Sequence, residues 1–78
     1  MSMFTYQIKK TPSGRYYVQV FVGSVCVATG RKTHETGEVA MTEITTAYEN
    51  GTMMQVANVT RRFMEIMEER RLVEKLKS

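Results

Sequence analysis

Three side chains in the segment RYYVQVFV, residues 15–22, offer the clearest binding chemistry in this sequence. Strand-like alternation puts Tyr17, Gln19 and Phe21 on one face and a row of valines on the other. An amide both donates and accepts hydrogen bonds, and aromatic rings stack on flat partners. This polar-aromatic face is therefore expected either to bind a partner or to be covered by a helix or a second subunit as a second core layer.

The charges are sorted along the chain, although the net charge is only +3. Residues 1–34 hold no carboxylate and these bases: Lys9, Lys10, Arg15, Arg31 and Lys32. Residues 35–50 hold glutamates and no base. A basic segment next to an acidic one predicts a dipolar molecule whose basic side meets an anion, with chance in a short chain as the alternative. In TGRKT, residues 29–33, a glycine and two bases precede a helix start, which suits one phosphate or an ordinary solvated loop.

Residues suited to catalysis or metal binding are sparse. The sequence has one histidine, His34, and one cysteine, Cys26, and the pattern places these on separate elements. The glutamates of residues 35–50 follow the first predicted helix, and no phosphate-binding glycine motif is present. We expect no enzyme, no cofactor and no metal site, with Cys26 as a small packed thiol.

Two hairpin turns predict a three-stranded antiparallel meander over residues 3–30. TPSG suits a three-residue loop with Gly14 left-handed, which pairs Ile8 with Val18. Gly23-Ser24 suits a two-residue type II′ turn, which pairs Val22 with Val25, Val20 with Val27 and Val18 with Thr29. In this register the polar-aromatic face also holds the following residues: Thr5, Gln7, Lys9, Cys26 and Ala28.

Two helices are expected after the meander. The first spans 34–49, capped by Thr33 or Thr36, with a stripe of mostly small residues that lets it lie close to the valines, and Asn50-Gly51 ends it. The second spans 53–76, with a short fourth strand at 53–57 and a helix that starts after Asn58 or Thr60 as the alternative. Such a helix is longer than the strands, so its apolar residues are expected to reach a partner: Met53, Phe63, Met64 and Met67.

The sequence therefore predicts one small α+β domain over residues 1–78: a three-stranded antiparallel β-meander followed by two α-helices. No apolar run is long enough to span a membrane, and no signal-peptide pattern begins the chain. We expect a cytoplasmic protein of phage or mobile-element origin that forms a homodimer.

Part of the chain resembles the small arm-type DNA-binding domains of phage tyrosine recombinases, which place a three-stranded sheet before a helix. The resemblance runs from Tyr6 to Asn50 and is carried by GRYYVQVFVG (14–23), VCVATG (25–30) and GRKTHETGEVAMTE (30–43). In that family the sheet enters the DNA major groove. The resemblance implies sheet contacts from Lys9, Tyr17 and Gln19, with bases at the margins.

Residues and resemblance together predict a non-enzymatic DNA-binding or nucleic-acid-binding accessory protein. The expected contacts are Lys9, Lys10, Arg15, Tyr17, Gln19, Arg31 and Lys32. The alternative is a small dimeric protein-interaction module, such as a phage-encoded inhibitor or adaptor that acts on a host protein or defence complex. Its acidic first helix would then imitate the charge of nucleic acid.

Overall fold

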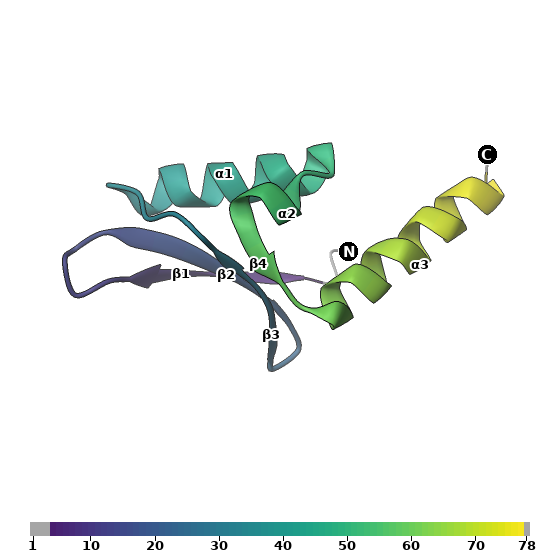
Figure 1. The fold of residues 1–78 in the computed structure, drawn as a ribbon, viewed down its shortest axis with the longest axis horizontal. Coiled ribbons are helices and arrows are strands. Elements are labelled where there is room, and N and C mark those ends of the chain that lie inside the picture. The colour runs from purple at the N-terminus through teal and green to yellow at the C-terminus, as the bar shows by residue number, and fades with distance from the viewer. Residues whose placement is uncertain (1–3, 78) are drawn as a thin grey trace.

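The computed structural model describes residues 4–77 and shows an α+β fold in which two helices lie on one side of an antiparallel sheet and a third extends from its end (Figure 1). The strands are β1 (Thr5–Lys10), β2 (Tyr16–Val22), β3 (Val25–Gly30) and β4 (Ala57–Val59), in the order β1-β2-β3-β4. The helices are α1 (Gly37–Asn50), α2 (Met53–Val56) and α3 (Arg61–Lys77). The predicted meander is confirmed from Thr5 onward. It was expected to begin at residue 3, which lies outside the described residues.

Both hairpin turns form as their sequences indicate. Gly14 has φ 85° and donates its amide to the Thr11 carbonyl at 2.9 Å. Gly23 has φ 61°, and Val22 pairs with Val25 across the two-residue loop. Glycine is required at both turns because a side chain strains a left-handed backbone. The first turn pairs Ile8 with Val18, as predicted.

A β-bulge in β3 shifts the second register by one residue. Phe21 pairs with Cys26, but Val20 pairs with Ala28, so Val27 is the extra residue. The predicted pairs of Val20 with Val27 and Val18 with Thr29 are therefore wrong. Val27 and Ala28 are both fully buried, so the bulge adds a residue to the core.

Helix α1 covers the valine face of the sheet. Thr36 caps it by accepting a hydrogen bond from the Val39 amide at 3.2 Å, and Gly51, with φ 72°, closes its last turn. The helix begins at Gly37 rather than at residue 34. The predicted stripe of small residues is confirmed, because Ala40, Ile44 and Ala47 are buried in one core with Val18 and Val20.

The continuous helix predicted over 53–76 is wrong, because β4 interrupts it. The chain makes one short helix, α2, then pairs with the free edge of β3, joining Thr29 to Asn58 and Gly30 to Ala57. An exposed strand edge carries unpaired backbone groups, and β4 satisfies those of β3. The alternative strand at 53–57 was placed too early. The alternative helix start after Thr60 is correct, since Thr60 accepts a hydrogen bond from the Phe63 amide at 3.3 Å.

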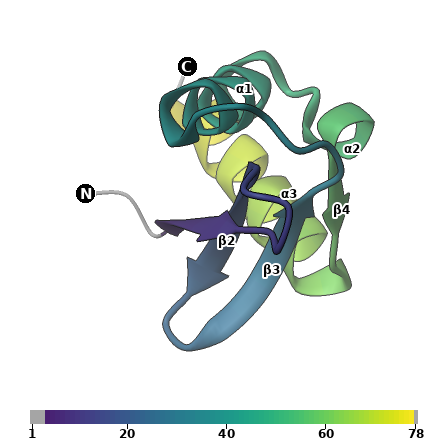
Figure 2. The same cartoon turned by 90° about the vertical axis from the view of Figure 1, so that its left-hand side faces the viewer.

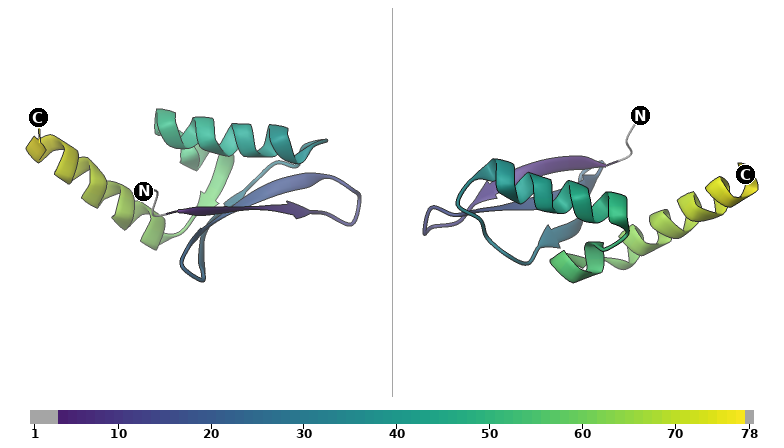
Figure 3. Two further views of the ribbon diagram at one scale, coloured as in Figure 1. Left: turned by 180° about the vertical axis from the view of Figure 1, so that it is seen from behind. Right: turned by 90° about the horizontal axis from the view of Figure 1, so that it is seen from above.

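Helix α3 is anchored at its first turns and then leaves the body. Phe63 and Ile66 are buried, and the Phe63 ring lies 5.5 Å from the Phe4 ring. Farther along, Arg70 hydrogen-bonds the Tyr48 hydroxyl and lies over its ring. The end of α3 projects away from the sheet and gives the molecule its longest dimension of 46 Å (Figure 3).

Replacing Ile66 with alanine tests this anchor. Ile66 is 1% exposed, so Ile66→Ala should lower the free energy of unfolding by about 2–5 kcal/mol. Val39 on the outer side of α1 is 52% exposed, so the control Val39→Ala should stay within about 0.5 kcal/mol of wild type. Urea denaturation followed by circular dichroism measures both. Equal stabilities would show that α3 does not dock on the sheet.

Candidate functional site

The polar-aromatic face is the side of the sheet that no helix covers within the described residues. Helices α1 and α2 lie together on the opposite side, as the view along the long axis shows (Figure 2). Tyr17, Gln19 and Phe21 each remain partly exposed. The polar-aromatic face is thus accessible to a partner and is not a second core layer within the chain.

A row of hydrogen-bonding side chains crosses the middle of this face. Strand pairing aligns Gln7 with Gln19, Gln19 with Thr29, and Thr29 with Asn58, one from each strand. The Gln19 amide donates to the Thr29 hydroxyl at 3.5 Å. Directly paired residues project to the same side of a sheet, so these four side chains form a continuous polar row. Amide and hydroxyl groups in such a row can both donate and accept hydrogen bonds to a ligand.

The two rings of the face lie on either side of the polar row. Tyr17 pairs with Lys9 on one side, and Phe21 pairs with Thr5 and Cys26 on the other. Cys26 is partly buried, and its thiol donates to the Ala28 carbonyl at 3.5 Å. Cys26 therefore serves as a packed residue of the face, as predicted. Ala28, predicted on this face, lies in the core instead because of the bulge, and Thr29 takes a place on the face.

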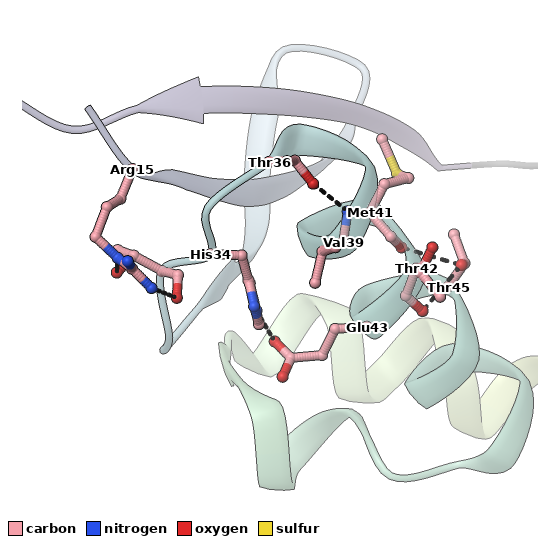
Figure 4. Close-up of polar contacts among 9 residues, drawn as sticks. Arg15, His34, Thr36, Val39, Met41, Thr42, Glu43 and Thr45 are labelled. Carbon is pink, nitrogen blue, oxygen red and sulfur yellow. Dashed lines mark hydrogen bonds and ion pairs between the residues drawn. The ribbon is translucent and has the colours of Figure 1, made fainter.

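The predicted basic residues gather at one end of the sheet. Strands β1 and β3 both finish where β2 begins, which brings these residues together. Contacts across this end tie its loops together: Arg15 donates to the Thr33 hydroxyl at 2.8 Å and to the Thr33 carbonyl at 3.0 Å (Figure 4). Arg31 donates from Nε to the side-chain amide oxygen Oδ1 of Asn58 at 3.1 Å, which connects the basic end to the polar row. Lys32 is exposed in the same loop.

Lys10 differs from the other bases because it lies on the helix side of the sheet. It pairs with Tyr16, and its ammonium lies 5.7 Å from the centre of the Tyr16 ring. Tyr16 belongs to the valine face and packs against the core. Lys9, its neighbour, pairs with Tyr17 on the polar-aromatic face. Two adjacent lysines thus point to opposite sides of the sheet.

The acidic residues lie on the helix side of the molecule. Glu43 of α1 contacts His34, with 3.0 Å between Nε2 and a carboxylate oxygen (Figure 4). The His34 backbone makes an isolated bridge to Tyr16, with two hydrogen bonds of 2.7 and 2.8 Å. This pair therefore holds the loop before α1 against β2. The glutamates of α1 and the bases at the end of the sheet therefore lie on separate elements, whereas α3 carries charges of both signs.

The four residues predicted for a partner surface all line one groove between the end of α1, α2 and α3. Met53 and Phe63 are only 4% exposed and belong to the core, so their assignment to a partner surface is corrected. Met64 is 49% exposed and Met67 is partly exposed. Burial raises the pKa of Tyr6 beside this region, and the nearby Glu49 adds to the effect while Arg70 opposes it.

Two members of the polar row, Thr29 and Asn58, were missed by sequence reasoning. The expected register placed Thr29 on the valine face, and Asn58 was expected within or before a helix.

Within residues 4–77 no group of three or more histidine, cysteine or carboxylate side chains could hold a metal ion. No helix of the described chain combines the length and apolar character needed to cross a membrane.

Comparison of the chain with protein-family models, with curated proteins and with solved structures gives no match. The protein is therefore classified by its fold alone, as a small α+β domain with a four-stranded sheet that is covered on one side.

Introducing a lysine at adjacent positions of β3 tests which residue belongs to the polar-aromatic face. Ala28 is 1% exposed, so Ala28→Lys buries a charge and should cost about 3 kcal/mol of stability or more. Thr29→Lys directs the same side chain to solvent and should cost about 1 kcal/mol or less. Thermal and urea unfolding measure the difference. The reverse order of stabilities would mean that the bulge at Val27 is absent.

Proposed function

We propose that this protein is a non-enzymatic nucleic-acid-binding accessory protein that binds through its polar-aromatic face. The observation that carries the proposal is the row of four hydrogen-bonding side chains that runs across the sheet and meets Arg31 at its basic end. None of the four strands carries a carboxylate. A polyanion is therefore attracted by the bases at the end of the sheet and is not repelled by any carboxylate on the strands.

The bases and the polar row have separate tasks in this proposal. Lys9, Arg31 and Lys32 contact phosphates, which supplies most of the affinity through release of counterions. The amides of Gln7, Gln19 and Asn58 hydrogen-bond base edges. The acidic side of α1 faces away from the ligand, so the dipole of the protein orients the sheet toward the phosphates during encounter.

Reversing the charge of either neighbouring lysine tests this proposal with a matched control. Lys9→Glu should lower the affinity for an oligonucleotide of about 20 nucleotides by roughly tenfold and reduce the salt slope by about one unit. Lys10→Glu makes the same change in net charge on the helix side, so its effect should stay below about threefold. Fluorescence anisotropy across a salt series, with single-stranded and duplex probes, measures both.

Equal effects of Lys9→Glu and Lys10→Glu would show that only net charge matters and that the polar-aromatic face is not the site. Absence of binding to either probe at about 50 mM salt would reject nucleic-acid binding altogether.

Self-association through α3 is the second candidate function, and the projecting half of that helix favours it. Leu72, Val73 and Leu76 are 52%, 49% and 86% exposed, although they are apolar. They lie within five consecutive positions, so helical spacing brings them close together on the part of α3 that leaves the body. A second copy of the same helix presents a matching apolar surface, as in a two-fold dimer.

Two glutamates placed on this surface test self-association. Leu72→Glu combined with Leu76→Glu should convert a dimer into a monomer in sedimentation equilibrium, because two carboxylates cannot be buried in the interface without positive charges to pair with them. Arg71→Glu makes the same net change of −2 in charge on another side of the helix and should leave the dimer intact. A wild-type protein that sediments as a monomer at all concentrations would exclude the dimer.

A further inference from the structure

Strand β2 carries two aromatic rings on the polar-aromatic face, and neither stacks on another ring within the described residues. Tyr17 and Phe21 lie four residues apart on β2, which corresponds to about 13 Å along a strand. The ring pairs of the described chain join Phe4 with Tyr48 and Phe4 with Phe63, all on the helix side. Both rings of the polar-aromatic face are partly exposed, so a flat ligand group can reach them.

Gln19 lies midway between the two rings and belongs to the polar row. Among residues 4–77, its side-chain amide hydrogen-bonds the Thr29 hydroxyl at 3.5 Å, which is a long contact that a ligand can replace. The next side chain in the row, Gln7, is exposed. The face therefore alternates ring, amide and ring along the middle of the sheet.

The width of the sheet distinguishes between paired and unpaired nucleic acid. Four strands about 4.8 Å apart place the outer strands about 14 Å from each other, before side chains are added. The major groove of a duplex is about 12 Å wide and admits a helix or two strands. At the polar row, where β4 pairs with Ala28, Thr29 and Gly30, a sheet of this width laid face-on is wider than the groove and holds Gln19 away from the base edges of a regular duplex. Unpaired bases have free faces and edges, so they can lie directly on such a surface.

We propose that the polar-aromatic face binds unpaired nucleic acid, with Tyr17 and Phe21 stacking on two bases and Gln19 hydrogen-bonding a base between them. This inference rests on the proposed nucleic-acid binding and names its substrate class. Charge complementarity supports it, because Lys9 lies beside Tyr17 and Arg31 lies at the same end of the face, where both can hold the phosphates of the strand. Stacking tolerates every base, so the expected binding is weakly selective in sequence.

Removing each ring while keeping the strand tests the stacking positions. Tyr17→Leu and Phe21→Leu should each weaken binding to a mixed-sequence single strand of about 12 nucleotides by about 5- to 150-fold. Tyr17→Phe and Phe21→Tyr retain a ring and should bind within about threefold of wild type. The same strand annealed to its complement should bind at least about tenfold more weakly than the single strand. Fluorescence anisotropy gives the affinities, and thermal melting shows that each variant is folded.

Single-stranded DNA and RNA of the same sequence are two arms of this experiment. Preferential binding of either one supports the proposal and identifies the sugar that the face accepts. Equal affinity for single strand and duplex, with Tyr17→Leu unchanged, would overturn the proposal while the proposed nucleic-acid binding stands. Failure of every probe would reject both. A wild-type dimer that Phe21→Lys converts to a monomer, with no binding by any probe, would assign the face to a second copy instead.

Discussion

The β-bulge at Val27 is the constraint on which the rest of the structure depends. The extra residue puts Val27 and Ala28 both into the core and reverses the alternation of β3 after them. As a result Thr29 moves to the polar-aromatic face, where it meets Gln19 and Asn58. The same shift leaves Gly30 beside the Val18 backbone. Any other residue there would place its Cβ 3.4 Å from the Val18 carbonyl oxygen. One inserted residue therefore both completes the core and assembles the polar row.

The helices cover only one side of the sheet, and this asymmetry gives the molecule its distinct surfaces. Small residues on α1 let that helix lie close to the valines, and the first turns of α3 seal the end of the core with Phe63 and Ile66. Within residues 4–77, no further helix or strand lies over the other side. The uncovered side compensates with amides, hydroxyls and bases, which stay hydrated without a partner and can bind one.

The uncovered surfaces differ in chemistry, which makes the two candidate functions compatible. The polar-aromatic face is basic at one end and suits an anion with flat groups, whereas the projecting half of α3 is apolar among mixed charges. These surfaces lie on different parts of the elongated molecule (Figure 1). A dimer through α3 would therefore leave both sheets accessible and would let two faces bind one polymer, which raises the effective concentration of the second contact.

The sequence by itself determined the features that short stretches of chain decide: both glycine turns, the Thr36 cap, the stop at Gly51, the first hairpin register and the two faces of β2. Turn and cap geometry depends on a few adjacent residues, so local rules suffice. Only the tertiary structure decided the bulge, the pairing of Ala57–Val59 with β3 and the burial of Met53 and Phe63. Each of these depends on which distant segment fills a space or satisfies a strand edge. The gathering of Lys9, Arg15 and Arg31 at one end, by contrast, follows from the predicted order of the meander.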